Sequence, residues 1–247
     1  MAGGALDLPR VIGHRGAMAH APENTGASLR QAAARGARWV EFDVRLTADG
    51  VPVVIHDPTL ERTTDGTGRV ASKTYDAIAA LDAGAWFAPR FAGERVPTLA
   101  ATFALLAELG LGANIEIKPT RGRQRDIVET VLAVLRARWP DHLPPPLLSS
   151  FDRKVLAALR DAGSPWPAGY LAKRLPQRWR AQVARLGADT VHVNHKALTE
   201  AAAAAVKATG RPLLAYTVDD PARARTLFGW GVDTVFSNAP EAIIGAI

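Results

Sequence analysis

Residues 38–43 read RWVEFD and residues 113–118 read ANIEIK, and these two stretches decide the fold expected for the chain. Each has the alternation of a buried strand, in which side chains two positions apart point to the same face. Glu41 and Asp43 therefore share one face of the first strand, and Glu116 occupies the equivalent face of the second. Buried carboxylates that lie side by side repel each other unless a positive charge compensates them. The sequence thus predicts a charged site built on two neighbouring strands.

Short apolar runs alternate with alanine- and leucine-rich segments of helical period along the chain. The strands are predicted at 10–12, 39–43, 113–117, 147–149, 168–171, 190–193, 213–216 and 234–236. The helices are predicted at 25–35, 98–109, 122–137, 152–162, 176–186, 197–208, 220–228 and 239–246. Eight such units in about 250 residues are typical of a (β/α)8 TIM barrel. A doubly wound sheet is the alternative, but no glycine-rich phosphate loop follows the first strand.

One connection departs from this rhythm. More than fifty residues separate the second strand from the helix at 98, whereas a βα loop usually has about two to six. The segment carries a strand signal at 53–55 and a helical stretch near 75–82. We expect 1–247 to form one barrel domain, within which residues 46–96 form an ordered cap at the catalytic face.

Composition limits the classes of function. The chain has 247 residues and a formal charge of +6, but no dense basic run with interleaved aromatic residues, so nucleic acid is not an expected partner. There is no cysteine, residues 1–10 lack signal-peptide features, and no apolar stretch approaches a membrane helix. We therefore expect a cytoplasmic protein without stable membrane insertion that acts on a small anionic molecule. The sequence does not decide between a monomer and a homodimer.

Polar side chains follow several predicted strands where each strand ends. In a barrel these ends form one mouth, whatever their separation in the sequence. Three carboxylates that converge there suit a hard divalent cation, Mg²⁺ or Ca²⁺. The alternative is that basic side chains neutralise the acids as buried salt bridges. The residues expected at this mouth are His14, Arg15, Glu41, Asp43, His56, Glu116 and Lys118.

Two histidines beside these acids point to acid–base chemistry. Histidine titrates near neutral pH, so one copy can accept a proton while another donates one. Phosphoryl transfer needs such a pair, together with cations that offset the charge of the phosphate oxygens. A further pair, His192 and Asn194, shares one strand face and is expected either to line the pocket or to fill the barrel interior.

A set of motifs occurs in a fixed order along the chain. It comprises VIGHRG at 11–16, APENT at 21–25, EFD at 41–43, LTADGVPVVIHD at 46–57, LERTTDGTG at 60–68, NIEIKP at 114–119, SSFD at 149–152, YTVD at 216–219 and WGVD at 230–233. This set resembles the glycerophosphodiester phosphodiesterase family over essentially the whole chain. The runs around 113–120, 145–151 and 192–196 resemble the cytoplasmic bacterial enzyme linked to glycerol-3-phosphate uptake.

The resemblance implies a TIM barrel with a family-specific insertion after its second strand. It also implies hydrolysis of glycerophosphodiesters, such as glycerophosphocholine or glycerophosphoethanolamine, to glycerol 3-phosphate and an alcohol. In the family mechanism, one histidine activates the glycerol 2-hydroxyl to form a cyclic phosphate, and the other protonates the leaving alcohol. Which histidine is the base stays open. The implied roles are one divalent cation on Glu41, Asp43 and Glu116, acid–base catalysis by His14 and His56, and substrate binding by Arg15, Lys118 and Tyr216.

Two positions depart from the family pattern. Tyr216 stands where a tryptophan is frequent, and Asn238 where an aspartate is common. We expect neither to touch the metal ligands or the acid–base pair. Two other functions remain open: a related barrel phospholipase, of the lysophospholipase D or phosphatidylinositol phospholipase C type, and a barrel that binds glycerophosphodiesters without cleaving them.

Overall fold

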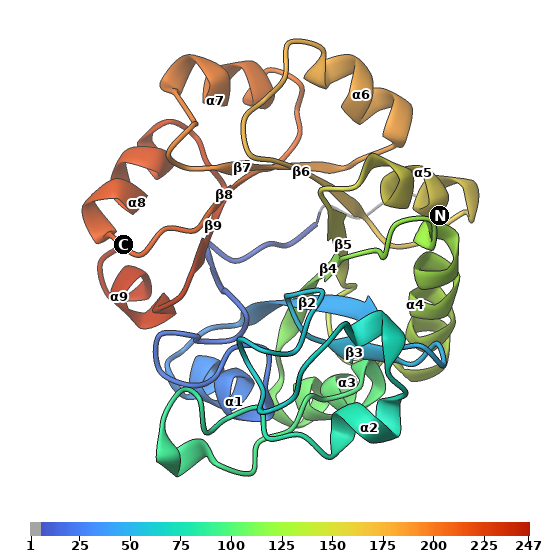
Figure 1. Cartoon of the computed structure of the whole chain (residues 1–247). Helices are drawn as coiled ribbons and strands as arrows, with labels where there is room; N and C mark the ends of the chain where they lie inside the picture. The colour runs from blue at the N-terminus through green and yellow to red at the C-terminus, as the bar shows by residue number, and fades with distance from the viewer. Residues whose placement is uncertain (1–5) are drawn as a thin grey trace.

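A closed barrel of eight parallel strands forms the centre of the molecule in the computed structural model, which describes residues 6–247 (Figure 1). Strand β1 pairs with β9 on one side and with β2 on the other, which closes the ring. The (β/α)8 prediction is therefore confirmed. Half of the stretch 1–10, in which no signal peptide was expected, lies outside the described residues. The barrel strands are β1 Val11–Gly13, β2 Trp39–Leu46, β4 Gly112–Ile117, β5 Leu147–Ser150, β6 Ala168–Ala172, β7 Thr190–Asn194, β8 Leu213–Tyr216 and β9 Thr234–Ser237.

Helices follow the strands and surround the barrel, as Figure 1 shows. Several begin at a residue whose side chain accepts a hydrogen bond from the backbone of the first turn, as Thr25, Thr98 and Asp152 do. Helix α3 ends at Gly110, whose φ of 66° suits glycine. The surrounding helices are α1 Gly26–Ala34, α3 Leu99–Leu109, α4 Gln124–Arg138, α5 Arg153–Asp161, α6 Trp179–Leu186, α7 Glu200–Lys207, α8 Pro221–Gly229 and α9 Pro240–Ile244.

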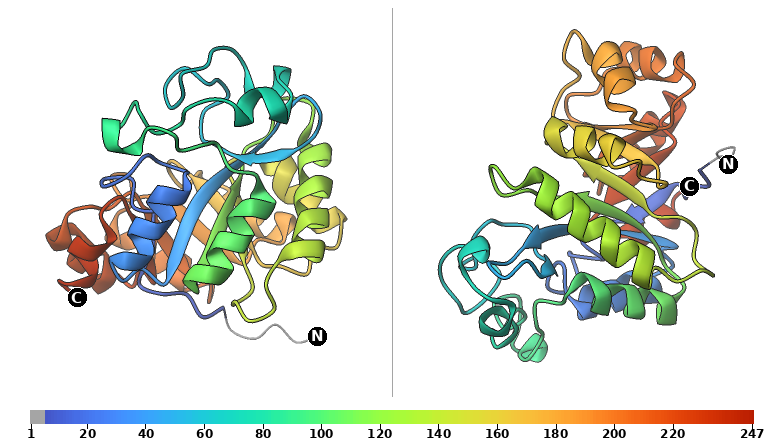
Figure 2. Two further views of the ribbon diagram at one scale, coloured as in Figure 1. Left: turned by 90° about the horizontal axis from the view of Figure 1, so that it is seen from below. Right: turned by 90° about the vertical axis from the view of Figure 1, so that its right-hand side faces the viewer.

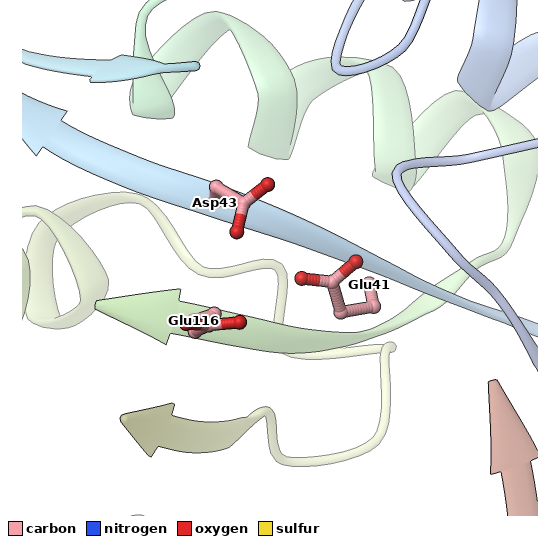
Figure 3. Close-up of side chains that lie close together, drawn as sticks. All are labelled: Glu41, Asp43 and Glu116. Atoms are coloured by element: carbon pink, nitrogen blue, oxygen red, sulfur yellow. The ribbon is translucent and has the colours of Figure 1, made fainter. Parts of the chain in front are cut away.

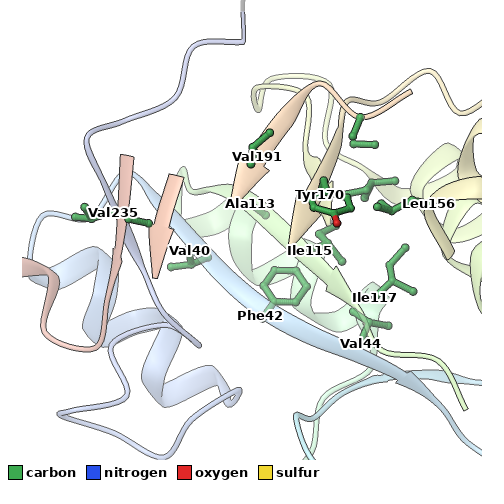
Figure 4. Packing of buried hydrophobic residues seen from close by; sticks show 14 of the residues in the cluster. Val40, Phe42, Val44, Ala113, Ile115, Ile117, Leu156, Tyr170, Val191 and Val235 are labelled. Atoms are coloured by element: carbon green, nitrogen blue, oxygen red, sulfur yellow. The ribbon is translucent and has the colours of Figure 1, made fainter. Parts of the chain in front are cut away.

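The main hydrophobic core lies between the barrel and the helices (Figure 4). Val40, Phe42 and Val44 of β2 are fully buried there, and Ile115 and Ile117 of β4 pack in the same layer. Because side chains alternate along a strand, residues 41, 43, 114 and 116 must then face the barrel interior. The apolar outer face thus fixes which polar side chains point inward.

The floor of the barrel interior is apolar. Ile12, Trp39, Leu147, Leu214 and Phe236 form a separate cluster in which each side chain is nearly inaccessible to solvent. A glycine at position 112 makes room for the Trp39 indole, since a Cβ there would lie 2.4 Å from indole atoms. Above this floor the inward-facing residues become charged, which places the polar site at the carboxyl ends of the strands.

The insertion after β2 is ordered and has a small core of its own. Strand β3, Pro52–Val54, pairs antiparallel with β2 and is followed by the 3-10 helices Val70–Ser72 and Pro89–Phe91 and helix α2, Tyr75–Ala79. The segment lies beyond the carboxyl end of β2, at one side of the barrel (Figure 2). Among residues 6–247, no helix is long and apolar enough to cross a membrane. The small core consists of Val53, Ile55, Leu60, Val70, Ile78, Ala83 and Val96.

Candidate active site

Three carboxylates from β2 and β4 converge at the mouth of the barrel. The strand register sets Asp43 opposite Glu116, and Glu41 lies two residues before Asp43 on the same face. Each residue offers a carboxylate oxygen within 4.8 Å of those of the other two, and all three are buried. Figure 3 shows the side chains of the two strands turned toward one another. The structure thus brings together the acids that the strand pattern assigned to one face.

Basic side chains compensate part of this negative charge. Lys118 Nζ lies 2.6 Å from Glu116 Oε1 and 3.1 Å from Asp43 Oδ1, and Arg15 Nε lies 3.3 Å from Asp43 Oδ2. Burial opposes the ionisation of Asp43, but Lys118 and Arg15 overcome it and hold the pKa of this carboxyl well below its usual range. The salt bridges weighed as the alternative to a metal are therefore present around Asp43.

The negative charge of Glu41 is compensated much less than that of Asp43. Among residues 6–247 it pairs with no lysine or arginine side chain, and its carboxylate accepts a hydrogen bond of 3.0 Å from the backbone N–H of Arg15. Burial, reinforced by Asp43 and Glu116, raises the pKa of Glu41 well above its ordinary value. Burial and Asp43 likewise raise the pKa of Glu116 to about 7. Lys118 and Arg15 therefore do not compensate the full negative charge of the cluster, and its three oxygen donors fit a hard divalent cation.

His14 follows β1 and is held by an amide. Its Nδ1 lies 2.6 Å from Asn238 Oδ1, and Asn238 Nδ2 donates to Asp219 Oδ2 over 2.8 Å. Because a carboxylate only accepts, the amide nitrogen must face Asp219 and the amide oxygen must face His14. His14 Nδ1 therefore carries a proton, and Nε2 keeps a free lone pair. Burial and the neighbouring Arg15 lower the pKa of His14 to about 4, so the ring is neutral.

The expectation that Asn238 lies away from the acid–base pair is wrong. The two residues are 224 positions apart, but closure of the barrel pairs Gly13 with Ser237 in adjacent strands. The residues that follow these partners, His14 and Asn238, then lie side by side. The hydroxyl of Tyr216, the other position that departs from the family pattern, donates to the backbone oxygen of Ala172 over 2.9 Å.

His56 is supplied by the insertion, directly after β3. Its Nδ1 lies 2.6 Å from Asp57 Oδ1, and Arg62 Nε donates to the other oxygen of Asp57. Burial lowers the pKa of His56, while Asp43 and the hydrogen bond to Asp57 act in the opposite direction. His56 thus has a carboxylate as its partner, whereas His14 has an amide.

Glu23 connects the two histidine-bearing segments and was not singled out from the sequence. Its buried carboxylate accepts from Arg15 Nη1 at 2.7 Å and from two nitrogens of Arg62 at 2.8 Å. The next residue, Asn24, donates to Asp43 Oδ2 over 2.9 Å and adopts a φ of 61°, which asparagine tolerates well. The APENT motif contained both residues, but nothing in its spacing indicated their partners.

A cavity of about 680 Å³ opens above the carboxylate cluster. Both histidines line it, and of the insertion only His56 does so. Asn194 also lines the cavity, whereas His192 is fully buried below it, with Nε2 2.8 Å from Thr190 Oγ1. Of the two placements left open by the sequence, His192 thus fills the barrel interior and Asn194 lines the cavity. The predicted residues on the cavity wall are His14, Arg15, Glu41, His56, Glu116, Lys118 and Tyr216.

The chain is similar to known proteins over nearly its whole length. The chain is 34% identical over 239 residues to a glycerophosphodiester phosphodiesterase of Caldanaerobacter subterraneus, covering 96% of this chain and 97% of that protein. It is similar to a solved Oleispira antarctica phosphodiesterase in complex with the product sn-glycerol-3-phosphate, with a TM-score of 0.94, 36% identity and coverage of 97% and 96% of the two chains. A glycerophosphodiester phosphodiesterase of Thermotoga maritima superposes with a TM-score of 0.77 at 25% identity, over 97% of this chain and 99% of that one. Residues 14–242 match the model of the glycerophosphoryl diester phosphodiesterase family, and the chain belongs to that family of enzymes.

Proposed function

We propose that the chain hydrolyses glycerophosphodiesters to sn-glycerol 3-phosphate and an alcohol, in a reaction that requires a divalent cation. The observation that carries this proposal is one cavity in which buried carboxylates, two histidines and two cationic side chains meet. Membership of the family and the product seen in the Oleispira antarctica enzyme support the substrate class. Glycerophosphocholine and glycerophosphoethanolamine are the first substrates to test.

Arg15 and Lys118 would hold the phosphate of the substrate. Both line the cavity, and both are already oriented by their ion pairs with Asp43. Donors fixed in place before the reaction stabilise developing charge on phosphate oxygens without having to reorganise.

The two histidines would divide the proton transfers. In the first step, neutral His14 accepts the proton of the glycerol 2-hydroxyl at Nε2, and the hydroxyl oxygen attacks phosphorus to form a cyclic phosphate. His56, whose Nδ1 is supported by the Asp57 carboxylate, donates a proton to the departing alcohol oxygen. Water then opens the cyclic phosphate with the two roles reversed. Because the nucleophile belongs to the substrate, the first step is intramolecular and gains from proximity.

Glu41, Asp43 and Glu116 would hold the cation, as Mg²⁺ or Ca²⁺. When bound, the cation supplies positive charge that offsets negative charge on the phosphate oxygens. The raised pKa values of Glu41 and Glu116 support this assignment, since such an ion relieves the repulsion among the three carboxylates. In the same proposal, the insertion belongs to the barrel domain and serves to position His56.

The test is release of sn-glycerol 3-phosphate from glycerophosphocholine and glycerophosphoethanolamine, measured in chelator and after addition of Mg²⁺ or Ca²⁺. We expect turnover only with the cation. Glu41→Gln should weaken cation binding, whereas Glu108→Gln, on the exposed surface of α3, serves as the matched control. Full turnover in chelator would show that the reaction does not require a divalent cation. A preference for a lysophospholipid would favour the phospholipase, and binding without turnover would favour the non-catalytic barrel.

A further inference from the structure

The cavity wall across from the carboxylate cluster is lined by β6, β7 and the residues that follow them. In the closed strand order, β7 lies four strands from β2 in either direction, so the two strands face each other across the barrel (Figure 1). This far wall, as we name it, consists of Leu171, Lys173, Asn194, His195 and Lys196. None of these residues has a part in the acid–base or metal-binding roles proposed above.

The far wall carries unneutralised positive charge. Lys173 and Lys196 are exposed at the cavity, and within residues 6–247 the lysines that form ion pairs are Lys118 and Lys207. The carboxylates that line the cavity in this part of the chain, Glu41 and Glu116, belong to the opposite wall. A ligand that extends from one wall to the other therefore passes from a cation-binding centre to two free ammonium groups.

The backbone that carries Lys196 is fixed. Asn194 Oδ1 accepts from the N–H of Lys196 over 2.9 Å, and the N–H of His195 donates to Tyr216 O over 2.9 Å. Arg223 donates to the backbone oxygen of His195 over 2.6 Å. The two acids whose charge acts on His195 have other partners: Asp219 accepts from Asn238, and Asp220 caps α8. They leave the ammonium groups available to a ligand.

His195 provides a second observation at the same place. Its Nδ1 is buried and has no hydrogen-bond partner among the described residues. Burial, then Arg223 and Lys196, lowers the pKa of His195, while Asp219 and Asp220 act in the opposite direction. In the tautomer that carries the proton on Nδ1, His195 has an unpartnered donor on the same wall as two free ammonium groups, which suits an anionic oxygen ligand.

We infer that the far wall selects glycerophosphodiesters whose alcohol carries a second anionic group, such as a phosphorylated polyol. This inference rests on the proposed function, and it assigns the alcohol rather than the glycerol to the side of the cavity that carries Lys173 and Lys196. A cationic alcohol such as choline would meet two charges of its own sign. Phosphate oxygens on the alcohol would instead form charge-assisted hydrogen bonds with both ammonium groups.

A matched pair of substrates tests this selection. Glycerophosphoinositol 4-phosphate and glycerophosphoinositol differ only in the second phosphate, and glycerophosphocholine supplies the cationic case. With saturating Mg²⁺, we expect a kcat/KM for the phosphorylated substrate at least about tenfold above the other two, since two partly exposed ion pairs together contribute about that factor. The preference should also shrink as the salt concentration rises.

The double variant Lys173→Gln/Lys196→Gln should remove the preference by raising KM for the phosphorylated substrate about tenfold, with kcat for glycerophosphocholine unchanged. The double variant Lys173→Arg/Lys196→Arg keeps both positive charges and should keep the preference for the phosphorylated substrate. Lys154→Gln removes one positive charge from the exposed surface of α5 and serves as the control for a change in net charge. Equal kcat/KM for the matched substrates in the unmodified enzyme, or equal slowing of all three in the glutamine variant, would overturn the inference while leaving the proposed function intact. No hydrolysis of any substrate would overturn the proposed function, and the inference with it.

Discussion

Glu116 should make the stability of the cation-free protein fall as the pH rises. Its pKa is raised from 4.5 to about 7 in the folded state, so between these values the native protein holds a proton that the unfolded chain has lost. Folding stability decreases with pH wherever the native state binds more protons. The full displacement corresponds to about 3 kcal/mol, of which about 2–3 kcal/mol develops between pH 5 and pH 8.

The size of this effect has to be measured as a difference. Burial lowers the pKa values of His14 and His192 to about 4 and about 3. Their contributions to folding stability therefore increase as the pH rises to 6.5, opposite in sign to the contribution of Glu116. Comparison of the unmodified chain with Glu116→Gln cancels these contributions. In chelator, we expect the melting temperature of the unmodified chain to fall, relative to Glu116→Gln, by about 5–10 °C between pH 5 and pH 8. The exposed-surface variant Glu108→Gln should follow the unmodified chain at each pH.

A divalent cation should remove this loss. At pH 8 a cation at a hundred times its Kd stabilises the folded state by about 2.7 kcal/mol. At pH 5 the ion must first displace the Glu116 proton, which weakens its apparent affinity about a hundredfold relative to pH 8. Scanning calorimetry with Mg²⁺, Ca²⁺ and chelator at both pH values measures the two effects. Equal stabilisation at pH 5 and pH 8, or a Glu116→Gln variant that parallels the unmodified chain, would refute the reasoning.

Three further predictions concern the histidines and their partners. His14→Ala and His56→Ala should each lower kcat at least about a hundredfold while the melting temperature changes little; near-normal turnover would mean that the residue is not an acid–base group. Asn238→Ala should lower kcat about ten- to a hundredfold with KM unchanged, and the ¹⁵N spectrum of His14 should show loss of the Nδ1–H tautomer; an unchanged tautomer would exclude a positioning role. Arg62→Ala should cost about 1 kcal/mol at pH 7, allowing for solvent screening, because the Arg62 hydrogen bond holds the pKa of Asp57 at about 2. Arg62 also lowers the pKa of Glu23 from 4.5, so the difference from the unmodified chain should be full above about pH 4.5 and be largely lost as the pH falls to about 2; a difference that persists undiminished at pH 2 would contradict the assignment.

The strand pattern predicted the carboxylate cluster because alternation is a local property. Val40 and Phe42 had to face the helices, so Glu41 and Asp43 had to face the interior, and the register of β4 then added Glu116. Helix ends were less well predicted. Helix α7 was expected from residue 197 but begins at Glu200, because the Thr199 side chain accepts from Ala202 N and caps the helix there.

The partners of the two histidines could not be predicted from periodicity. Asn238 reaches His14 only because β1 pairs with β9 and closes the barrel. The sequence around either residue contains no periodic pattern that indicates this pairing. Glu23 meets Arg62 through an irregular insertion without a repeating pattern. Both contacts depend on which segments lie together in space, and a single sequence does not carry that information.

The location of the catalytic set has a consequence for how this enzyme can diverge. Its proposed acids, histidines and phosphate-binding groups all occur between residues 14 and 118, whereas the far wall, which we propose meets the alcohol, belongs to the part of the cavity lining between residues 151 and 217. Substitutions in the second half of the barrel can therefore alter which alcohol is accepted without disturbing the groups that break the phosphate ester. The family can therefore acquire new substrates through substitutions in the second half of the barrel. Asn238, which follows β9 and holds His14, and Asp219, which holds Asn238, are the residues there that we expect to be retained.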